Sequence, residues 1–121
     1  MKRDMDLVRK IVFVLEEHSL GYHAESVTID GYTKDQICYH AYIMKQAGLI
    51  DGVDLALRTG QSPSVMPTKL TWEGHEFADA ARNETNWKKA TTKIAATVGT
   101  ASLAVLTELL KQIAKDALGL K

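Results

Sequence analysis

The stretch TKDQICYHAYIMKQAGLI, residues 33–50, decides the centre of the fold. It opens with Thr33 and Gln36, a capping-box pair in which each side chain satisfies a backbone donor of the other residue. Apolar residues then recur at the three- and four-residue spacing of an amphipathic helix. Gly48 is of a residue type that commonly ends a helix, and two apolar residues follow it. The pattern predicts a helix over residues 33–47 that stops abruptly before a segment able to pack back.

The flanking sequence predicts further helices and one hairpin around this central helix. Aspartates near the N-terminus can cap a first helix, and turn-forming residues separate the later segments. The expected elements are a helix from Asp4 or Asp6 to about Glu17, a strand at Val27–Ile29, hairpin strands at 53–58 and 65–71, a helix capped by Thr71, and C-terminal helices from Trp87 onward with Ser102 as a second cap. The predicted class is therefore mainly α with a small β-hairpin (α+β).

This element order is that of a winged helix. We therefore expect a winged-helix-like domain over residues 1–84 and a C-terminal helical extension over residues 85–121. A helix-turn-helix needs a bracing helix before its recognition helix, yet the chain between Ile29 and Gly48 has room for one good helix. The bracing helix is either absent or reduced to a turn around residues 30–33. Such a shortened motif suits DNA binding less well, and winged helices also bind proteins.

Four segments of the chain carry a resemblance to a known family. They are MKRDMDLVRKI (residues 1–11), Gly31-Tyr32, the helix end Ala47–Ile50, and LTWEGHEF (residues 70–77). These segments are similar to an uncharacterised family of small phage and prophage proteins, classed as a domain of unknown function, whose members begin MKRDMDLVRxI. The resemblance implies a phage-related origin and a winged-helix-like fold, and it implies no established activity.

Composition limits the partners and the compartment. The chain has 121 residues, and its fifteen basic and fifteen acidic residues cancel. Because phosphate neutralisation supplies most non-specific DNA affinity, a DNA contact would have to come from a local basic patch. Cys38 is the only cysteine, and the N-terminus lacks the apolar run of a signal peptide. We therefore expect a cytoplasmic protein, in the host cytoplasm if it is phage-encoded.

The outward face of the 33–47 helix and the hairpin carry the candidate contact residues. Gln can read adenine, Lys can read guanine or phosphate, and Tyr can contact the backbone, so this face could touch DNA. Asp35 near the helix start would repel phosphate, and a solvated or protein-binding face is the favoured explanation. The candidates for DNA or partner contact are Lys34, Gln36, Tyr39, His40, Lys45 and Gln46 on the helix, and Arg58 and Lys69 on the hairpin.

Reactive side chains do not form a recognisable catalytic or metal pattern. Cys38 and His40 are two residues apart on a helix and point in different directions, and zinc-type ligand spacing is missing. Acids lie beside histidines in two places, but neighbouring helix residues do not face each other. We therefore expect no enzyme activity, no metal and no cofactor. Trp72 and Trp87 are expected to pack in the core.

The C-terminal segment contains a short heptad seam. Threonines within the segment and charges after it argue against a membrane span, and its lysines are too few for a helix lying on a membrane. The seam is expected to bury itself against a helix of a second copy, giving a homo-oligomer, or against the first helix of the same chain, and the homo-oligomer is favoured. Its residues are Leu103, Leu106, Leu110 and Ile113.

These features favour a small winged-helix interaction protein of phage or prophage type, oligomeric and binding a protein partner. The alternative is a DNA-binding transcriptional regulator that uses the 33–47 helix and the wing at residues 53–71. The zero net charge, the missing bracing helix and the apolar C-terminal seam favour the interaction protein.

Overall fold

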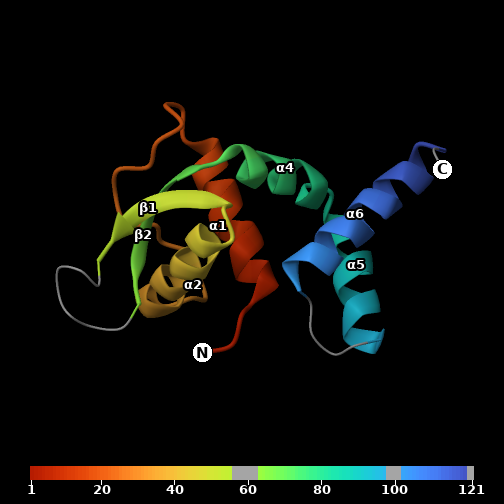
Figure 1. The fold of residues 1–121 in the computed structure, drawn as a ribbon, viewed down its shortest axis with the longest axis horizontal. Coiled ribbons are helices and arrows are strands. Elements are labelled where there is room, and N and C mark those ends of the chain that lie inside the picture. The colour runs from red at the N-terminus through yellow and green to blue at the C-terminus, as the bar shows by residue number, and fades with distance from the viewer. Residues whose placement is uncertain (56–62, 98–101, 120–121) are drawn as a thin grey trace. The chain divides into compact units, whose positions relative to one another are not determined.

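A computed structural model describes residues 1–55, 63–97 and 102–119. The described chain is mainly helical with one antiparallel hairpin, which confirms the predicted α+β class (Figure 1). It divides into two compact units, Met1–Ala78 and Asp79–Lys121. The elements are α1 (Met5–Glu17), α2 (Lys34–Gln46), β1 (Ile50–Asp54), β2 (Val65–Leu70), α4 (Trp72–Ala81), α5 (Glu84–Thr97) and α6 (Leu103–Ala117).

Helix α1 begins at an aspartate cap, as its sequence predicts. The Asp4 carboxylate accepts hydrogen bonds from the backbone N–H groups of Asp6 and Leu7, at 2.9 and 3.2 Å. It thereby satisfies donors that the first turn of a helix leaves unpaired. The apolar stripe of α1 packs against α2 and β2. Its buried members are Leu7, Val8, Ile11, Val12 and Leu15.

Helix α2 carries the predicted capping box. The Thr33 hydroxyl accepts the N–H of Gln36, and the Gln36 side chain accepts the N–H of Thr33. After the helix, Gly48 has a φ of +81°, a left-handed conformation that residues with a Cβ rarely adopt. The chain reverses at this glycine, so β1 starts at Ile50 rather than at the predicted residue 53.

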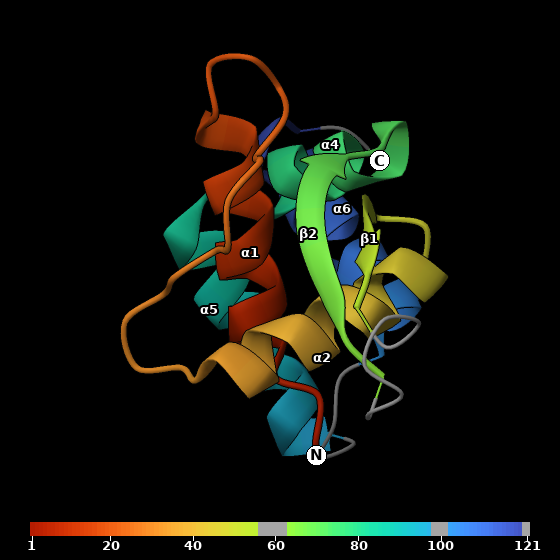
Figure 2. The ribbon, with the colours of Figure 1, turned by 90° about the vertical axis from the view of Figure 1, so that its left-hand side faces the viewer.

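Strands β1 and β2 form an antiparallel hairpin with a bulge. The register shifts after Asp51, which leaves Thr68 as an extra residue on β2. The Thr68 hydroxyl donates to the Asp51 carbonyl oxygen at 3.2 Å, and the Thr68 carbonyl accepts the N–H of His23 at 2.6 Å. The latter bond holds the 18–26 loop beside β2, which lies between β1 and α1 in Figure 2. Among the described residues the sheet consists of β1 and β2, and the strand predicted at Val27–Ile29 does not form.

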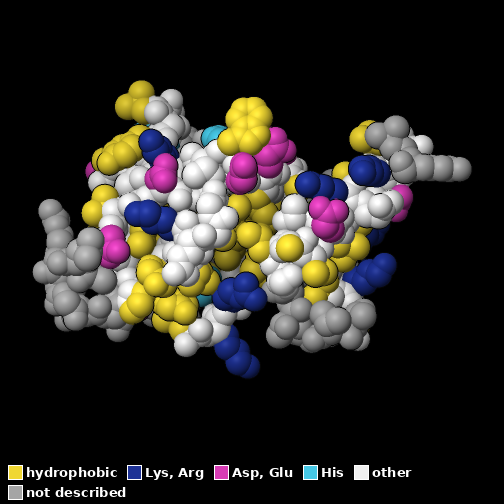
Figure 3. All heavy atoms as spheres, in the orientation of Figure 1, with side chains coloured by type: hydrophobic (Ala, Val, Ile, Leu, Met, Phe, Trp, Pro, Cys, Tyr) yellow, Lys and Arg dark blue, Asp and Glu magenta, His cyan; other side chains and the backbone are white. Residues whose placement is uncertain are grey.

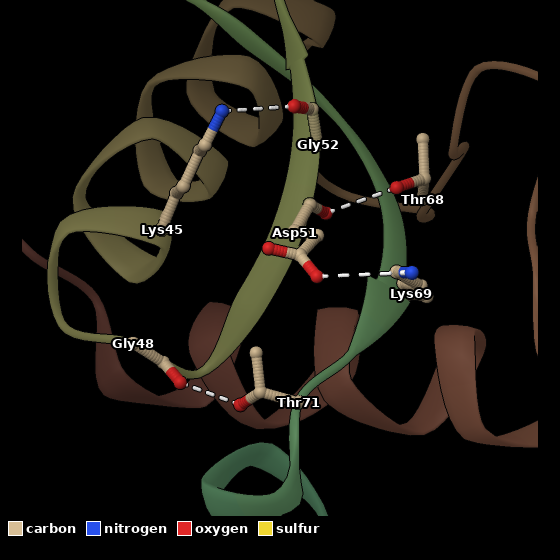
Figure 4. A network of polar contacts seen from close by, with 7 residues as sticks. All are labelled: Lys45, Gly48, Asp51, Gly52, Thr68, Lys69 and Thr71. Atoms are coloured by element: carbon tan, nitrogen blue, oxygen red, sulfur yellow. Dashed lines mark hydrogen bonds and ion pairs between the residues drawn. The ribbon is translucent and has the colours of Figure 1, made fainter.

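Thr71 joins the hairpin to α4. Its hydroxyl accepts the N–H of Gly74 and donates to the carbonyl oxygen of Gly48 (Figure 4), while its own N–H donates to the carbonyl of Leu49. Gly74 lies so close to Leu49 that an added Cβ would overlap the Leu49 carbonyl oxygen. The end of α2 and the start of α4 are therefore joined by direct backbone contact.

The second unit contains α5 packed against α6. Helix α5 begins at Glu84, before the predicted start at Trp87, because the Asn83 side chain accepts the N–H of Asn86 and caps it. Ser102 caps α6 as predicted, since its hydroxyl accepts the N–H of Val105. Within the part of the chain that the structure describes, every helix is too short or too polar to cross a membrane.

Candidate functional site

His40 does not lie on the outward face of α2, and that expectation is wrong. Its side chain is 1% exposed. The ring nitrogen Nε2 accepts the backbone N–H of Asp4 at 2.8 Å, and Nδ1 donates to the carbonyl oxygen of Gln36 at 2.8 Å. His40 follows the buried Ile37 by three residues, so both side chains lie on the same side of the helix. Both nitrogens are therefore engaged within the chain rather than available for DNA or a partner.

The other candidate residues of α2 are exposed or half-buried. Gln36 is held by the capping box, and the Gln46 amide donates to the Tyr42 hydroxyl at 3.1 Å. The rings of Tyr39 and Tyr42 are neighbours, with centroids 6.2 Å apart. Lys34 is exposed at the start of the helix, next to an exposed aspartate. This face of α2 therefore carries tyrosine rings and side-chain amides. At the start of the helix, the positive charge of Lys34 lies next to the negative charge of Asp35.

The lysines near the hairpin contact β1. Lys45 Nζ donates to the carbonyl oxygen of Gly52 at 3.0 Å, and Lys69 Nζ lies 4.0 Å from the carboxylate of Asp51 (Figure 4). The predicted contact residue Arg58 lies outside the described residues. In Figure 3, basic and acidic side chains are interspersed over this part of the surface instead of forming a basic patch. A phosphate bound by Lys69 would be repelled by the neighbouring carboxylate of Asp51.

The formal charge is divided unevenly along the chain. Residues 1–78 contain eleven acidic and eight basic residues, a net charge of −3. Residues 79–121 contain four acidic and seven basic residues, a net charge of +3. Because non-specific DNA affinity depends on positive charge facing phosphate, the first unit is poorly suited to DNA, although it contains the predicted DNA-contact helix and hairpin.

The centre of the predicted seam is buried without a second copy. Leu106 is 0% exposed and Leu110 is 1% exposed. Leu103 and Ile113 are half-buried. Since α6 packs on α5 in the same chain, a single chain is sufficient to cover the middle of the seam. Self-association through these residues stays a prediction.

Asp4 and Tyr32 form a polar cluster that spacing in the sequence did not indicate. The Tyr32 hydroxyl donates to the second carboxylate oxygen of Asp4 at 3.0 Å. Burial raises the pKa of Tyr32, and the hydrogen bond to Asp4 and the negative charges of Asp4 and Asp6 raise it further. The ammonium of Lys10 lies 5.3 Å from the centre of the Tyr32 ring. Asp4 and Tyr32, both in segments that carry the family resemblance, therefore have a structural role.

The two tryptophans differ in exposure. Trp87 is 3% exposed, as predicted, but Trp72 is 77% exposed, so the prediction of a packed Trp72 is wrong. At about 100° per residue, Trp72 lies on the side of α4 opposite to the buried Phe77 and Ala78. This helical position is the signal in the sequence that would have placed Trp72 outside the core.

Further exposed apolar side chains lie on the 18–26 loop. The hydrogen bond between His23 and Thr68 holds this loop next to β2, and Trp72 begins α4 after the single linking residue Thr71. The loop exposes Leu20 and Tyr22. We call Trp72, with the carboxylates described next, the Trp72 surface.

The carboxylates of the Trp72 surface are those of Glu73 and Glu76. Both side chains are exposed on the first turns of α4. Figure 3 shows a large hydrophobic side chain above α4 with acidic side chains beside it. Among the described residues, neither carboxylate lies in an ion pair. Glu73 also suits the helix dipole at this end, but that effect does not account for an exposed tryptophan.

The fold and this surface define a small, mainly helical α+β protein with an exposed aromatic side chain at the start of one helix. The chain belongs to the family described as "Hypothetical protein (DUF2513)", whose model matches residues 2–101. An uncharacterized protein of Haemophilus influenzae (strain ATCC 51907 / DSM 11121 / KW20 / Rd) is 34% identical over 118 residues, which cover 95% of this chain and 93% of the relative. No solved structure matches the chain significantly.

Proposed function

We propose that this chain is a small interaction module of phage or prophage type that binds a protein partner through the Trp72 surface. The observation that carries the proposal is the 77% exposure of Trp72. Tryptophan is among the residues most enriched at the energetic centres of protein interfaces. Fully burying a large apolar side chain contributes about 1.5–3 kcal/mol, so a partner that covers Trp72 gains binding energy that the free chain leaves unused.

The charges of the Trp72 surface favour a protein over a nucleic acid. Glu73 and Glu76 would attract a basic side chain of a partner, and the indole face of Trp72 would also attract a cation. The same carboxylates would repel phosphates. The partner is therefore expected to present apolar groups next to lysine or arginine.

Affinity capture with matched variants tests this function. Wild type, Trp72→Ala and Val53→Ala serve as baits in a lysate of a bacterium that encodes a relative. Val53 is the control, since it is an exposed apolar residue on β1. A protein retained by wild type and by Val53→Ala should be depleted roughly tenfold or more on Trp72→Ala, the loss expected of an interface hot spot. Equal retention of every captured protein by all three baits would refute the proposal.

The competing DNA function has its own expected result. Binding of the chain to a short fluorescent duplex at physiological ionic strength should be no tighter than general non-specific binding, about 10⁻⁴–10⁻⁶ M. The reason is the net charge of −3 on residues 1–78 and the pairing of Lys69 with Asp51. Fluorescence anisotropy of the labelled duplex measures the dissociation constant. Tight binding that weakens steeply with salt and is lost in a Lys34→Ala, Lys69→Ala double variant would instead support the DNA-binding regulator.

A further inference from the structure

The N-terminal segment before α1 is held on α2 by His40. The imidazole is buried and both ring nitrogens are bonded. A backbone N–H can only donate and a carbonyl oxygen can only accept. Nε2, which faces the N–H of Asp4, must therefore carry no proton, and Nδ1, which faces the carbonyl of Gln36, must carry one. The contacts define a neutral imidazole with a single tautomer.

Protonation of this imidazole would break the contact with Asp4. A proton on Nε2 would point at the N–H of Asp4, so that two donors would face each other in a buried place. The hydrogen bond would be lost while a positive charge was created beneath the N-terminal segment.

In the described part of the chain, the carboxylate of Asp4 already has its own hydrogen-bond partners. This carboxylate, at the start of α1, accepts the N–H groups of Asp6 and Leu7 and the hydroxyl of Tyr32. Accepting an imidazolium as well would weaken the helix cap or the Tyr32 bond. Tyr32 is also acted on by the negative charge of Asp6 and faces the ammonium of Lys10. The Tyr39 ring lies edge-on to His40, with centroids 6.1 Å apart.

We propose that His40 is a pH-sensitive latch that holds residues 1–4 against α2 when neutral and releases them when protonated. The backbone of Asp4 is held by His40, and the side chain of the same residue caps α1 and accepts Tyr32. Release of residues 1–4 therefore also loosens the first turn of α1 and the segment that carries Tyr32. Acidification would free the exposed, basic Lys2 and Arg3 from their anchored position.

NMR of the full chain tests the latch at two levels. At neutral pH, the ¹⁵N shifts of His40 should show a protonated Nδ1 and a bare Nε2. Hydrogen exchange then follows the Asp4 amide between about pH 7.5 and pH 5, the range in which histidine titrates. After correction for the intrinsic pH dependence, its protection factor should fall about tenfold or more in wild type.

Two variants make the result specific. His40→Gln keeps an acceptor and a donor but cannot titrate, so its Asp4 amide should keep the same protection at both pH values. His75→Gln removes an exposed histidine and should lose protection at low pH as wild type does. Nε2 protonated at neutral pH, or a wild-type protection factor that does not change with pH, would overturn the latch. The wild-type measurements decide the matter even if His40→Gln does not fold.

Discussion

Replacing Gly74 by alanine is expected to lower the free energy of unfolding by at least about 3 kcal/mol, or to prevent folding. In an ordinary helix the same change stabilises by roughly 0.5–1 kcal/mol, so the sign is reversed here. The reason is contact: an added Cβ would overlap the carbonyl oxygen of Leu49 and press on a side-chain carbon of Leu70 at 3.1 Å. Urea unfolding followed by circular dichroism measures the effect.

Gly21→Ala is the matched control for this prediction. Gly21 has a φ of +70° and open space around it, so alanine there introduces backbone strain without a clash. That strain costs about 1–2 kcal/mol. Gly74→Ala should therefore be clearly less stable than Gly21→Ala. A Gly74→Ala chain as stable as wild type would show that α2 and α4 do not meet at this glycine.

Replacing Leu106 by alanine is expected to cost about 2–5 kcal/mol, the range for truncating a fully buried leucine. Leu106 is 0% exposed in a single chain. The loss should therefore be the same at every protein concentration. Unfolding of wild type and variant at two widely separated concentrations checks both statements.

The neighbouring Val105 provides the control for Leu106. Val105 is exposed on the same helix, and Val105→Ala should change stability by about 0.5 kcal/mol or less. If the unfolding midpoint of wild type rises with concentration, a second copy contributes to the stability of the seam. That result would restore the prediction of a homo-oligomer built on Leu103, Leu106, Leu110 and Ile113.

The features of the fold that sequence reasoning predicts well are those set by local backbone chemistry. Asp4, Thr33, Thr71 and Ser102 each cap the helix that the sequence assigns to them. A cap works through donors two or three residues away, so a short window of sequence contains the whole interaction. The start of β1 was missed because the sharp reversal at Gly48 depends on contacts with Thr71, which lies far along the chain.

Two side chains of the candidate site differ from the prediction, one because of a long-range contact and one because of its position on its own helix. The prediction of an outward-facing His40 is wrong because the ring binds the backbone of Asp4, which is 36 residues away in the chain. Trp72 was assigned to the core because tryptophan is usually well buried. Its position on the outer side of α4 outweighs that tendency. Both errors concern which face a side chain occupies rather than which element it belongs to.

Several residues in the segments of family resemblance have structural roles. Asp4 and Tyr32 bind each other, Gly48 reverses the chain, and Gly74 allows backbone contact. Trp72 lies in one of these segments, yet it is largely exposed. We propose that binding to a partner explains the presence of Trp72 in this segment.

Site-specific photo-crosslinking in living cells tests this central claim most directly. A photoreactive amino acid with a large aromatic side chain, which can still fill the partner's site, replaces Trp72 in the full chain, and the same amino acid replaces Val53 in a parallel control. The account predicts a discrete covalent adduct with another protein from position 72, and no such adduct from position 53. Absence of an adduct at position 72, or the same adducts from both positions, would contradict the assignment of the Trp72 surface as the partner-binding site.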